Sequence, residues 1–255
     1  MKLKNKTVLI TGATSGIGEA TALTFAKQNC NLIITGRRKE RLTELKKLIE
    51  SKYKVHVATL NFDIRKFSEV RKAFNSLPSG FRNIDILINN AGLSRGLNKL
   101  QDGVLEDWEE MIDTNVKGLL YVTKEVLKIM LKNNSGHIIN IGSIAGHEVY
   151  PAGNVYCASK HAVDALTKGL RMDLNGTDIR VSTIDPGLVE TEFSIVRFRG
   201  DKKRAKKVYE GLKPLSPEDV ADAILYAASR PQNIVVAEMI LLPSAQAHSM
   251  IVNRE

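Results

Sequence analysis

Short apolar runs alternate with longer amphipathic segments along the whole chain. The runs are rich in valine and isoleucine, and each precedes or follows a segment in which apolar residues recur at helical spacing. Because the runs are continuously apolar, we expect their strands to be buried on both faces of a sheet. The pattern predicts strands at residues 7–12, 31–36, 55–60, 85–92, 137–143, 180–187 and 234–242.

Helical patterns separate these strands. One helix is expected to begin near Ile17, two others to span residues 38–52 and 67–77, and more to lie around Trp108 and Tyr121. Strands joined by helical crossovers form parallel sheets with right-handed connections. We therefore predict an α/β fold, a doubly wound, parallel, seven-stranded sheet of the Rossmann type.

The domain organisation follows from the absence of a Pro/Gly/Ser-rich linker or an internal repeat in the sequence. We expect one domain over residues 1–255. The longest interval between strands late in the chain, around residues 188–217, is predicted to be a helical excursion that covers the site.

Composition narrows the class of protein. Of the 255 residues 43% are hydrophobic and 25% charged, and there are only two cysteines, Cys30 and Cys157. A disulfide framework and a CxxC metal or redox site are therefore excluded, and we expect no metal.

The apolar runs are far shorter than the roughly 20 residues that span a bilayer, and the start of the chain is typical of a first strand rather than a signal peptide. We expect no membrane partner and a cytoplasmic protein.

The net charge is +9, and much of it lies in residues 197–207. Such a charge can attract nucleic acid or other polyanions. The lysines are scattered over every predicted helix, however, and no nucleic-acid-binding motif is present. We interpret the basic residues as solvated surface charges and expect no nucleic-acid partner.

A glycine-rich turn, TGATSGIG at residues 11–18, connects the first strand to the first helix. Glycines at such a turn let the backbone approach a pyrophosphate, which then lies at the positive end of the helix. A tight turn alone needs one glycine with positive φ, whereas this one also has two hydroxyl residues. We predict a dinucleotide site made by Gly12, Thr14, Ser15, Gly16, Ile17 and Gly18.

The second strand ends at Gly36 and is followed by Arg37 and Arg38. An enzyme that uses NAD usually has an acid about 20 residues after the glycines, against the ribose hydroxyls. An arginine there pairs with a 2′-phosphate instead. We therefore predict NADP(H) as the cofactor, with the alternative that one or both arginines are only the solvated start of a helix.

A tyrosine and a lysine, Tyr156 and Lys160, lie four residues apart and hence on one face of a predicted helix. A nearby ammonium lowers the pKa of a phenol, so we expect the pKa of Tyr156 to be low enough for acid–base chemistry. Ser143 ends a strand at the sheet edge where ligands bind in this fold class. Each residue also has a structural alternative: a half-buried tyrosine, a solvated lysine and a helix cap.

Six motifs in this order and spacing resemble the short-chain dehydrogenase/reductase family, over roughly residues 6–243. They are TGATSGIG, NNAG at 89–92, TNVKG at 114–118, Ser143, YCASK at 156–160 and PGLVETEF at 186–193. The resemblance implies that Tyr156 is the general acid for carbonyl reduction and the base for alcohol oxidation. Ser143 would orient the carbonyl, and Lys160 would lower the tyrosine pKa and bind the nicotinamide ribose.

The resemblance also assigns supporting residues. Asn115 would hold a water in a proton relay, and an Asn within an apolar helix often marks a backbone irregularity. Asp63 and Ile64 would flank the adenine, although Asp63 can equally cap the following helix. The remaining cofactor contacts would come from Asn90, Ala91, Gly92, Pro186, Gly187, Val189 and Thr191.

The substrate prediction rests on PAGNVYCASK and PGLVETEFSIVRFRGD, which are similar to the branch of NADP-dependent 3-hydroxy acid dehydrogenases acting on serine and allo-threonine. An acid needs a cation, and Arg197, Arg199 or Lys203 in the covering excursion can supply it. We select Arg197, with solvated surface charge as the alternative. The second enzyme hypothesis is a broad reductase of aldehydes, ketones or diketones.

Other classes are less favoured. The complete set of reacting residues argues against a non-catalytic dinucleotide sensor, and sugar-nucleotide epimerases with the same tyrosine–lysine pair are typically longer. Cys157 and His161 are also four apart, so an activated thiolate is geometrically possible. The helical rotation places Cys157 away from the Tyr156 face, so we expect a packing residue.

The family commonly forms homotetramers through the helices of Asn115 and Tyr156 and through the last strand, which we expect here too.

Overall fold

Parallel strands form the centre of the structure, a computed structural model that describes residues 3–255. The sheet has the order β3-β2-β1-β4-β5-β6-β7, and every neighbouring pair is parallel. The order reverses between β1 and β4, where doubly wound folds have their crevice. The strands are β1 (Thr7–Ile10), β2 (Asn31–Gly36), β3 (Val57–Asn61), β4 (Ile86–Asn89), β5 (Gly136–Ile141), β6 (Ile179–Pro186) and β7 (Glu238–Leu241).

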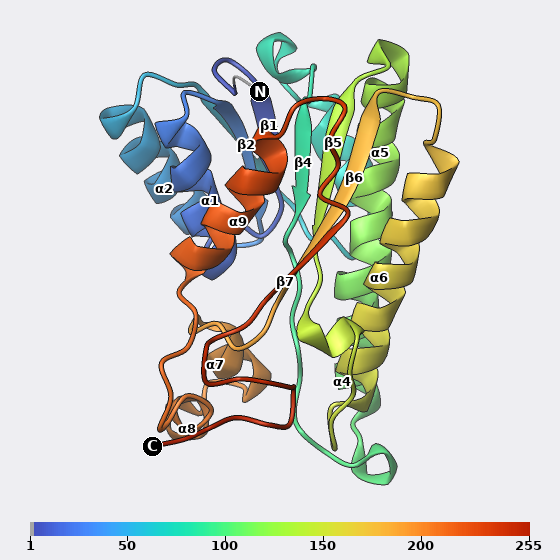
Figure 1. The fold of residues 1–255 in the computed structure, drawn as a ribbon. Coiled ribbons are helices and arrows are strands. Elements are labelled where there is room, and N and C mark those ends of the chain that lie inside the picture. The colour runs from blue at the N-terminus through green and yellow to red at the C-terminus, as the bar shows by residue number, and fades with distance from the viewer. Residues whose placement is uncertain (1–2) are drawn as a thin grey trace.

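Helices cover both faces of the sheet, which confirms the predicted α/β architecture (Figure 1). One face carries α1 (Gly16–Lys27), α2 (Lys39–Lys52) and α9 (Pro217–Ser229), and the other carries α3 (Phe67–Asn75), α5 (Leu119–Asn133) and α6 (Asn154–Asp173). At the carboxyl edge of the strands lie α4 (Leu105–Ile112), α7 (Phe193–Arg197) and α8 (Lys202–Lys207). Short irregular helices are η1 (Ser79–Phe81), η2 (Leu100–Asp102), η3 (Asp113–Gly118) and η4 (Ile144–Gly146).

Two hydrophobic cores result from the strand geometry. Successive side chains of a strand point to opposite faces, so Val8 and Ile10 pack beneath α1, α2 and α9 whereas Leu9 packs beneath α3 and α5. Ile33 and Leu87 join Leu9 in the second core. All five side chains have at most 1% of their surface exposed, which explains why the strands are apolar without alternation.

The last strand is shorter than predicted, because residues 234–237 do not pair as a strand. The guanidinium of Arg180 donates hydrogen bonds to the carbonyls of Arg230, Pro231 and Ile234, which holds the turn at residues 232–233 just before this stretch. Pairing begins where Glu238 meets Thr183. Before β7, Ala237 accepts hydrogen bonds from the Thr183 N–H and the Arg171 side chain. The residues between α9 and β7 therefore satisfy part of their backbone through two arginines rather than through the sheet alone.

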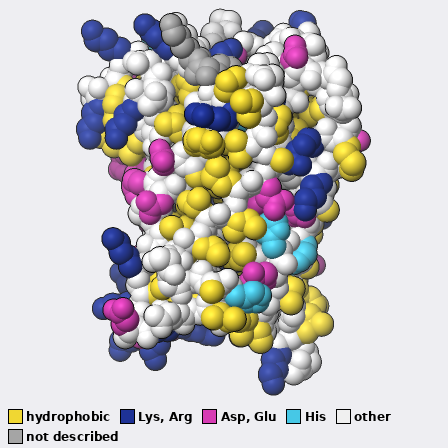
Figure 2. Space-filling view, viewed as in Figure 1, with side chains coloured by type: hydrophobic (Ala, Val, Ile, Leu, Met, Phe, Trp, Pro, Cys, Tyr) yellow, Lys and Arg dark blue, Asp and Glu magenta, His cyan; other side chains and the backbone are white. Residues whose placement is uncertain are grey.

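No helix within residues 3–255 is both long and apolar enough to cross a bilayer. The interval around residues 188–217 contains two short helices, α7 and α8. Figure 2 shows Lys and Arg side chains gathered at the lower left, where Figure 1 places α8. In this helix Lys202, Lys203, Arg204, Lys206 and Lys207 are exposed, as expected for solvated charges.

A buried histidine makes the stability of this fold sensitive to acid. His137 lies in β5, 1% exposed, with Nε2 hydrogen-bonded to Ser182 and Nδ1 without a partner. Burial, with a contribution from Arg180, lowers the pKa of His137 from 6.5 to about 3. The unfolded chain therefore binds one more proton than the folded chain between these values, and folding stability is lost as pH falls from about 6.5 towards 3.

We predict that His137→Gln reduces the loss of unfolding free energy with acid by up to about 1.4 kcal/mol per pH unit. Urea unfolding at pH 7, 5.5 and 4.5 measures this slope. The matched control is His56→Gln, which removes a histidine that is exposed in the folded protein. An unchanged slope in His137→Gln would contradict the prediction.

Candidate active site

A cleft of about 880 Å³ opens at the carboxyl edge of the sheet, between the strand ends and the excursion that carries α7 and α8. Parallel strands bring their carboxyl ends to one edge, so motifs far apart in sequence meet here. Two of the predicted residues do not line the cleft but contact residues that do: Gly18 lies against Gly12, and Asn115 is hydrogen-bonded to Leu93. The others line the cleft: Gly12, Thr14, Ser15, Gly16, Ile17, Arg37, Arg38, Asp63, Ile64, Asn90, Ala91, Gly92, Ser143, Tyr156, Lys160, Pro186, Gly187, Val189, Thr191 and Arg197.

The glycine-rich loop is shaped by its neighbours. Gly12 has φ +66° and Gly16 has φ +55°, in the left-handed region that favours glycine. A Cβ at Gly18 would overlap the carbonyl oxygen of Gly12. The side-chain amide of Asn90 donates to the carbonyls of Thr11 and Gly12 at 2.9 and 3.2 Å. The NNAG motif thus holds the loop open towards the cleft.

The amino end of α1 faces this loop. Its N-cap residue, Ser15, makes no capping hydrogen bond with its side chain. The first N–H groups of an α-helix have no intrahelical partner, and together with the helix dipole they attract anions. The loop and α1 therefore form a backbone site suited to phosphate groups.

The two predicted arginines differ in their surroundings. Arg38 donates to the hydroxyls of Thr14 and Ser15 at 2.9 and 2.7 Å and forms an ion pair with Glu192 at 2.7 Å. Arg37 is half exposed, and its guanidinium lies 3.8 Å from the nearest carboxylate oxygen, on Glu110. Arg38 thus orders the loop, and Arg37 is the more available of the two for a ligand.

Glu192 is a residue that the sequence reasoning missed. It belongs to the PGLVETEF motif and binds both Arg38 and Arg41, at 2.7 and 2.8 Å. These ion pairs join the glycine-loop side of the cleft to the start of the covering segment. No local sequence signal identifies a contact between residues that lie more than 150 positions apart in the chain.

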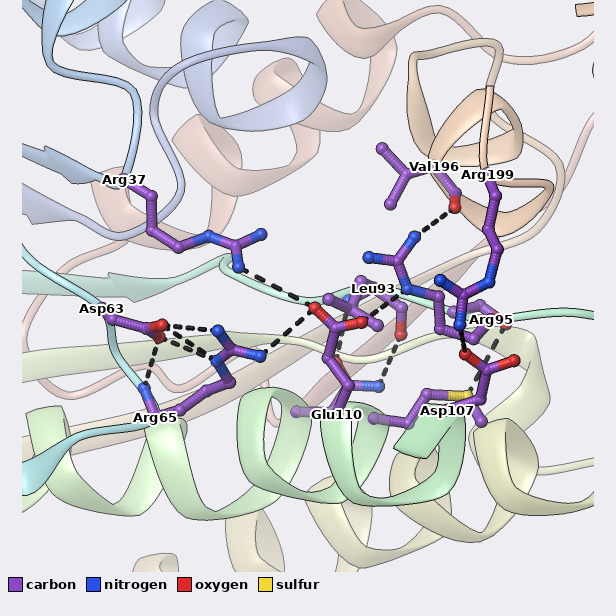
Figure 3. A network of polar contacts seen from close by, with 12 residues as sticks. Arg37, Asp63, Arg65, Leu93, Arg95, Asp107, Glu110, Val196 and Arg199 are labelled. Carbon is purple, nitrogen blue, oxygen red and sulfur yellow. Dashed lines mark hydrogen bonds and ion pairs between the residues drawn. The ribbon is translucent and has the colours of Figure 1, made fainter. Parts of the chain in front are cut away.

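The predicted capping role of Asp63 is wrong. The N-cap of α3 is Lys66, and the Asp63 carboxylate instead accepts hydrogen bonds from the backbone and side chain of Arg65. Hydrogen bonds from Arg65 hold the pKa of Asp63 below its usual value despite partial burial. Asp63 and Ile64 line the cleft, and Figure 3 shows Asp63 on the same side of Glu110 as Arg37.

Asn115 lies in η3, a π-helical turn between α4 and α5, which confirms the predicted irregularity. Its side chain is 2% exposed. The amide accepts from the N–H of Leu93 and donates to the Leu93 carbonyl, both at 2.8 Å, and to the Ser159 hydroxyl at 2.9 Å. Ser159, whose role the sequence left open, in turn donates to the Tyr156 carbonyl. Asn115 therefore ties the cleft wall to the helix of Tyr156 and Lys160.

Ser143, Tyr156 and Lys160 meet at the centre of the cleft, each no more than 9% exposed. The Lys160 ammonium donates to the Ile141 carbonyl at 2.9 Å and lies 6.0 Å from the centre of the Tyr156 ring. Ser143 caps η4 by accepting from the Ala145 N–H, so its capping role holds as well. The structure thus places the three side chains in the lining of one cleft.

The predicted lowering of the tyrosine pKa is wrong for this structure. Burial raises the pKa of Tyr156, and the opposing effects come first from the charge of Arg197 and then from a hydrogen bond with Ser143. Burial also lowers the pKa of Lys160 to about 8. The four-residue spacing does bring the ammonium to the Tyr156 ring, but burial outweighs the charges and hydrogen bonds that favour the phenolate. Tyr156 is thus a protonated phenol at neutral pH.

The guanidinium of Arg197 lies over the face of the Tyr156 ring. Its guanidinium carbon is 5.3 Å from the ring centre of Tyr156 and 5.2 Å from that of Phe193. Among the described residues the guanidinium makes a single hydrogen bond, donated to the Tyr150 hydroxyl at 3.0 Å, and its buried Nε has no partner. Since a guanidinium has five N–H donors, Arg197 brings unused donors and a positive charge to the reacting centre.

The other two cations considered for this role are placed differently. Arg199 forms an ion pair with Asp107 on α4. Lys203 is exposed on α8 and does not line the cleft. Of the three candidates, only Arg197 combines contact with Tyr156 and the lack of a carboxylate partner among the described residues.

The residues after β6 form the remaining wall. The Pro186 carbonyl lies 3.4 Å from the Ser143 hydroxyl, and Thr191 packs against Gly16 of the glycine loop. A Cβ at Gly187 would overlap the side chain of Gln246, whose oxygen accepts from the Leu188 N–H. The carboxyl-terminal segment therefore supports the covering excursion, a contact that the motifs did not indicate.

Cys157 and His161 do not form a reactive pair. The imidazole contacts the Cys157 backbone carbonyl at 2.9 Å rather than the thiol. The thiol is 1% exposed within an apolar cluster that also contains Tyr156, so it lies nearer to the tyrosine than predicted. Burial raises the pKa of Cys157. The structure agrees with a packing residue.

Outside the cleft, His147, Asp164 and Glu238 have side-chain ligand atoms within 4.8 Å of one another. The ammonium of Lys168 lies 2.8 Å from Asp164 and 3.7 Å from Glu238. The positive charge of Lys168 therefore already offsets part of the negative charge of these two carboxylates.

Comparison with known proteins agrees with this geometry. A family model described as short chain dehydrogenase matches residues 6–201. An NADP-dependent 3-hydroxy acid dehydrogenase of Schizosaccharomyces pombe is 46% identical over 255 residues, 100% of this chain and 98% of the relative. Sulfoacetaldehyde reductase 2 of Chromohalobacter salexigens is 45% identical over 243 residues, 95% of this chain and 96% of the relative. A solved closed form of serine dehydrogenase complexed with NADP+ has a TM-score of 0.91 and 45% identity, covering 98% of this chain and 100% of that one.

Proposed function

The chain belongs to the short chain dehydrogenase family, and from this membership we propose that it is an NADP(H)-dependent oxidoreductase of 3-hydroxy acids such as serine or allo-threonine. The substrate carbon that bears the hydroxyl or carbonyl group is the one oxidised or reduced. The observation that carries the substrate class is the Arg197 guanidinium, 5.3 Å from the Tyr156 ring with one protein hydrogen bond.

The cleft residues fit a dinucleotide that carries a 2′-phosphate. A Cβ at Gly18 would close the loop at Gly12, and the amino end of α1 has no side-chain cap, so a pyrophosphate is accommodated by backbone N–H groups. Arg37 would bind the 2′-phosphate, with Arg38 ordering Thr14 and Ser15. When bound, NADP(H) supplies or accepts the hydride.

Tyr156 transfers the proton. Because burial raises the pKa of its phenol, Tyr156 is protonated at neutral pH and can donate to the oxygen of a carbonyl substrate. The Ser143 hydroxyl, at the end of β5, would hold the same oxygen and stabilise the negative charge that develops on it. In the oxidative direction Tyr156 must first lose its proton, and the Lys160 ammonium stabilises the resulting phenolate.

The positions of these groups are maintained by hydrogen bonds of Lys160 and Asn115. Lys160 is held by the Ile141 carbonyl, and Asn115 binds both Leu93 and Ser159. We propose that Lys160 also binds the nicotinamide ribose and that Asn115 keeps α6 in register with the cleft wall. Correct orientation of reacting groups supplies a large part of catalysis, so these contacts serve turnover directly.

Arg197 would bind the carboxylate of the substrate. Charge-assisted bonds between a guanidinium and a carboxylate are strong and directional. Both a 3-hydroxy acid and sulfoacetaldehyde, the substrates named for two relatives, carry an anionic group near the reacting carbon. A cation above Tyr156 suits this shared chemistry better than it suits neutral ketones or diketones.

We further propose a homotetramer in the cytoplasm. Ile240 on the edge strand and Met250 and Ile251 in the carboxyl-terminal segment are exposed, as are Leu131 on α5 and Met172 on α6. Figure 2 shows hydrophobic side chains along the middle of the face that carries β7. Exposed apolar residues on a sheet edge and on long helices support association between copies of the chain.

We predict that Tyr156→Phe lowers kcat by at least about 10²-fold, because the general acid is removed. The affinity for NADPH should be nearly unchanged, since the ring and its packing remain. Absorbance of NADPH during turnover and fluorescence titration of NADPH measure the two quantities. Wild-type turnover in this variant would rule out the proposed mechanism.

We predict that Arg197→Met raises the KM for 3-hydroxypropanoate with NADP+ by about 10- to 100-fold, the effect of losing a charge-assisted hydrogen bond. Lys203→Met, which removes an exposed cation of the same excursion, is the control and should leave KM unchanged. An unchanged KM in Arg197→Met would contradict the carboxylate site. A wild-type preference for neutral ketones over acids would favour the broad reductase instead.

We predict a sedimentation coefficient that corresponds to four chains. Ile240→Lys, which places a charge on the exposed edge strand, should shift the distribution towards smaller species because the charge would be desolvated in an interface. A wild-type protein that sediments only as a monomer would contradict the tetramer.

A further inference from the structure

Arg95 connects the wall of the cleft to the helix that carries Arg197. It lies beyond the carboxyl end of β4, and its side chain is 15% exposed. Its Nε donates to Glu110 at 2.6 Å and its Nη1 donates to the carbonyl of Val196 at 2.5 Å. The next residue, Gly96, donates its N–H to the carbonyl of Arg197 at 3.0 Å. Figure 3 shows the side chain of Arg95 between Glu110 and Val196.

These bonds hold a helix that is too short to be stable by itself. Helix α7 has five residues, and isolated helices of that length do not persist in water. Arg95 and Gly96 bind the carbonyls of its last two residues, Val196 and Arg197, at the end where helix carbonyls lack intrahelical partners. The Val196 carbonyl also accepts from the Arg199 N–H at 3.2 Å. A cation at this end also interacts favourably with the helix dipole. The backbone position of Arg197 therefore depends on Arg95.

Glu110 in turn determines where Arg95 points. Its carboxylate is only 17% exposed, and the hydrogen bond from Arg95, ahead of all other causes, holds the pKa of Glu110 below its usual value. The other oxygen faces Arg65 at 3.3 Å and Arg37 at 3.8 Å. One turn earlier on α4, Asp107 binds Arg199. Helix α4 is thus linked to the covering segment on both sides of Arg197. Glu110 is linked to Val196 through Arg95, and Asp107 binds Arg199 directly.

We propose that Arg95, oriented by Glu110, is a positioning residue that sets the Arg197 guanidinium above Tyr156 and thereby makes the enzyme selective for substrates with a carboxylate. The inference rests on the proposed function, since it assigns the selectivity to the placement of Arg197. It predicts that the preference for a charged over a neutral substrate depends on Arg95 and Glu110, although both side chains form their hydrogen bonds with other protein residues.

The test compares an acid with its neutral ester. Values of kcat and KM are measured with NADP+ for 3-hydroxypropanoate and for methyl 3-hydroxypropanoate in the wild type, Arg95→Met and Glu110→Gln. We expect the ratio of kcat/KM for acid over ester to fall at least tenfold in Arg95→Met and at least threefold in Glu110→Gln, through KM for the acid. Glu109→Gln, at the adjacent exposed position of α4, is the control and should keep the wild-type ratio.

The sign of the Glu110→Gln effect separates positioning from direct binding. If Arg95 contacts the substrate carboxylate itself, removing the negative charge of Glu110 strengthens the positive field and lowers KM for the acid. If Arg95 acts through Arg197, losing its orienting partner raises that KM. A lower KM in Glu110→Gln would therefore overturn the inference.

The double variant Arg95→Met/Arg197→Met provides an independent check. Two residues that act through one contact are not additive, so Arg95→Met should change the acid-to-ester ratio less than twofold when Arg197 is already methionine. Full additivity would overturn the inference. Should Arg95→Met fail to fold, as judged by thermal unfolding, the nearly isosteric Glu110→Gln decides.

Failure of the inference can be distinguished from failure of the proposed function. If the wild type does not prefer the acid and Arg197→Met changes nothing, the proposed substrate class is wrong. If the wild type prefers the acid and Arg197→Met removes this preference, but Arg95→Met and Glu110→Gln do not, only the positioning role is wrong.

Discussion

Parallel pairing of the strands is the constraint on which the rest of this structure depends. Because all strands run in one direction, their carboxyl ends share one edge, and the residues that follow them line one cleft. The glycine loop after β1, Ser143 after β5 and Pro186 at the end of β6 meet there for this reason. The continuous burial of the strands is the energetic basis of the arrangement, since both faces are covered by helices.

The reacting centre is both buried and connected to its surroundings. Desolvation raises the pKa of Tyr156 and lowers the pKa of Lys160, so it favours the neutral form of both groups. The site tolerates a buried ammonium because Lys160 has a carbonyl partner at Ile141. Asn115 links α6 to the opposite wall through Ser159, which makes the irregular turn of η3 a structural requirement of the centre.

The covering segment supplies specificity, and it is held mainly by arginines. Arg38 and Arg41 bind Glu192 at its start, while Arg95 and Arg199 connect its end to α4. Arg197, between these attachments, has no carboxylate partner in the described part of the chain. The partial neutralisation of the other arginines explains how a strongly basic segment can present one functional cation to a small anionic substrate.

The sequence by itself determined the α/β class, the seven strands, the glycine loop, the tyrosine–lysine face and the backbone irregularity at Asn115. These features depend on periodicity and on interactions between near neighbours in the chain, which a sequence pattern records directly. The pattern did not predict the unpaired stretch at residues 234–237, the partners of Asp63 and Arg38, or the raised pKa of Tyr156. Only the tertiary structure decided these, because they depend on burial and on contacts between segments far apart in the chain.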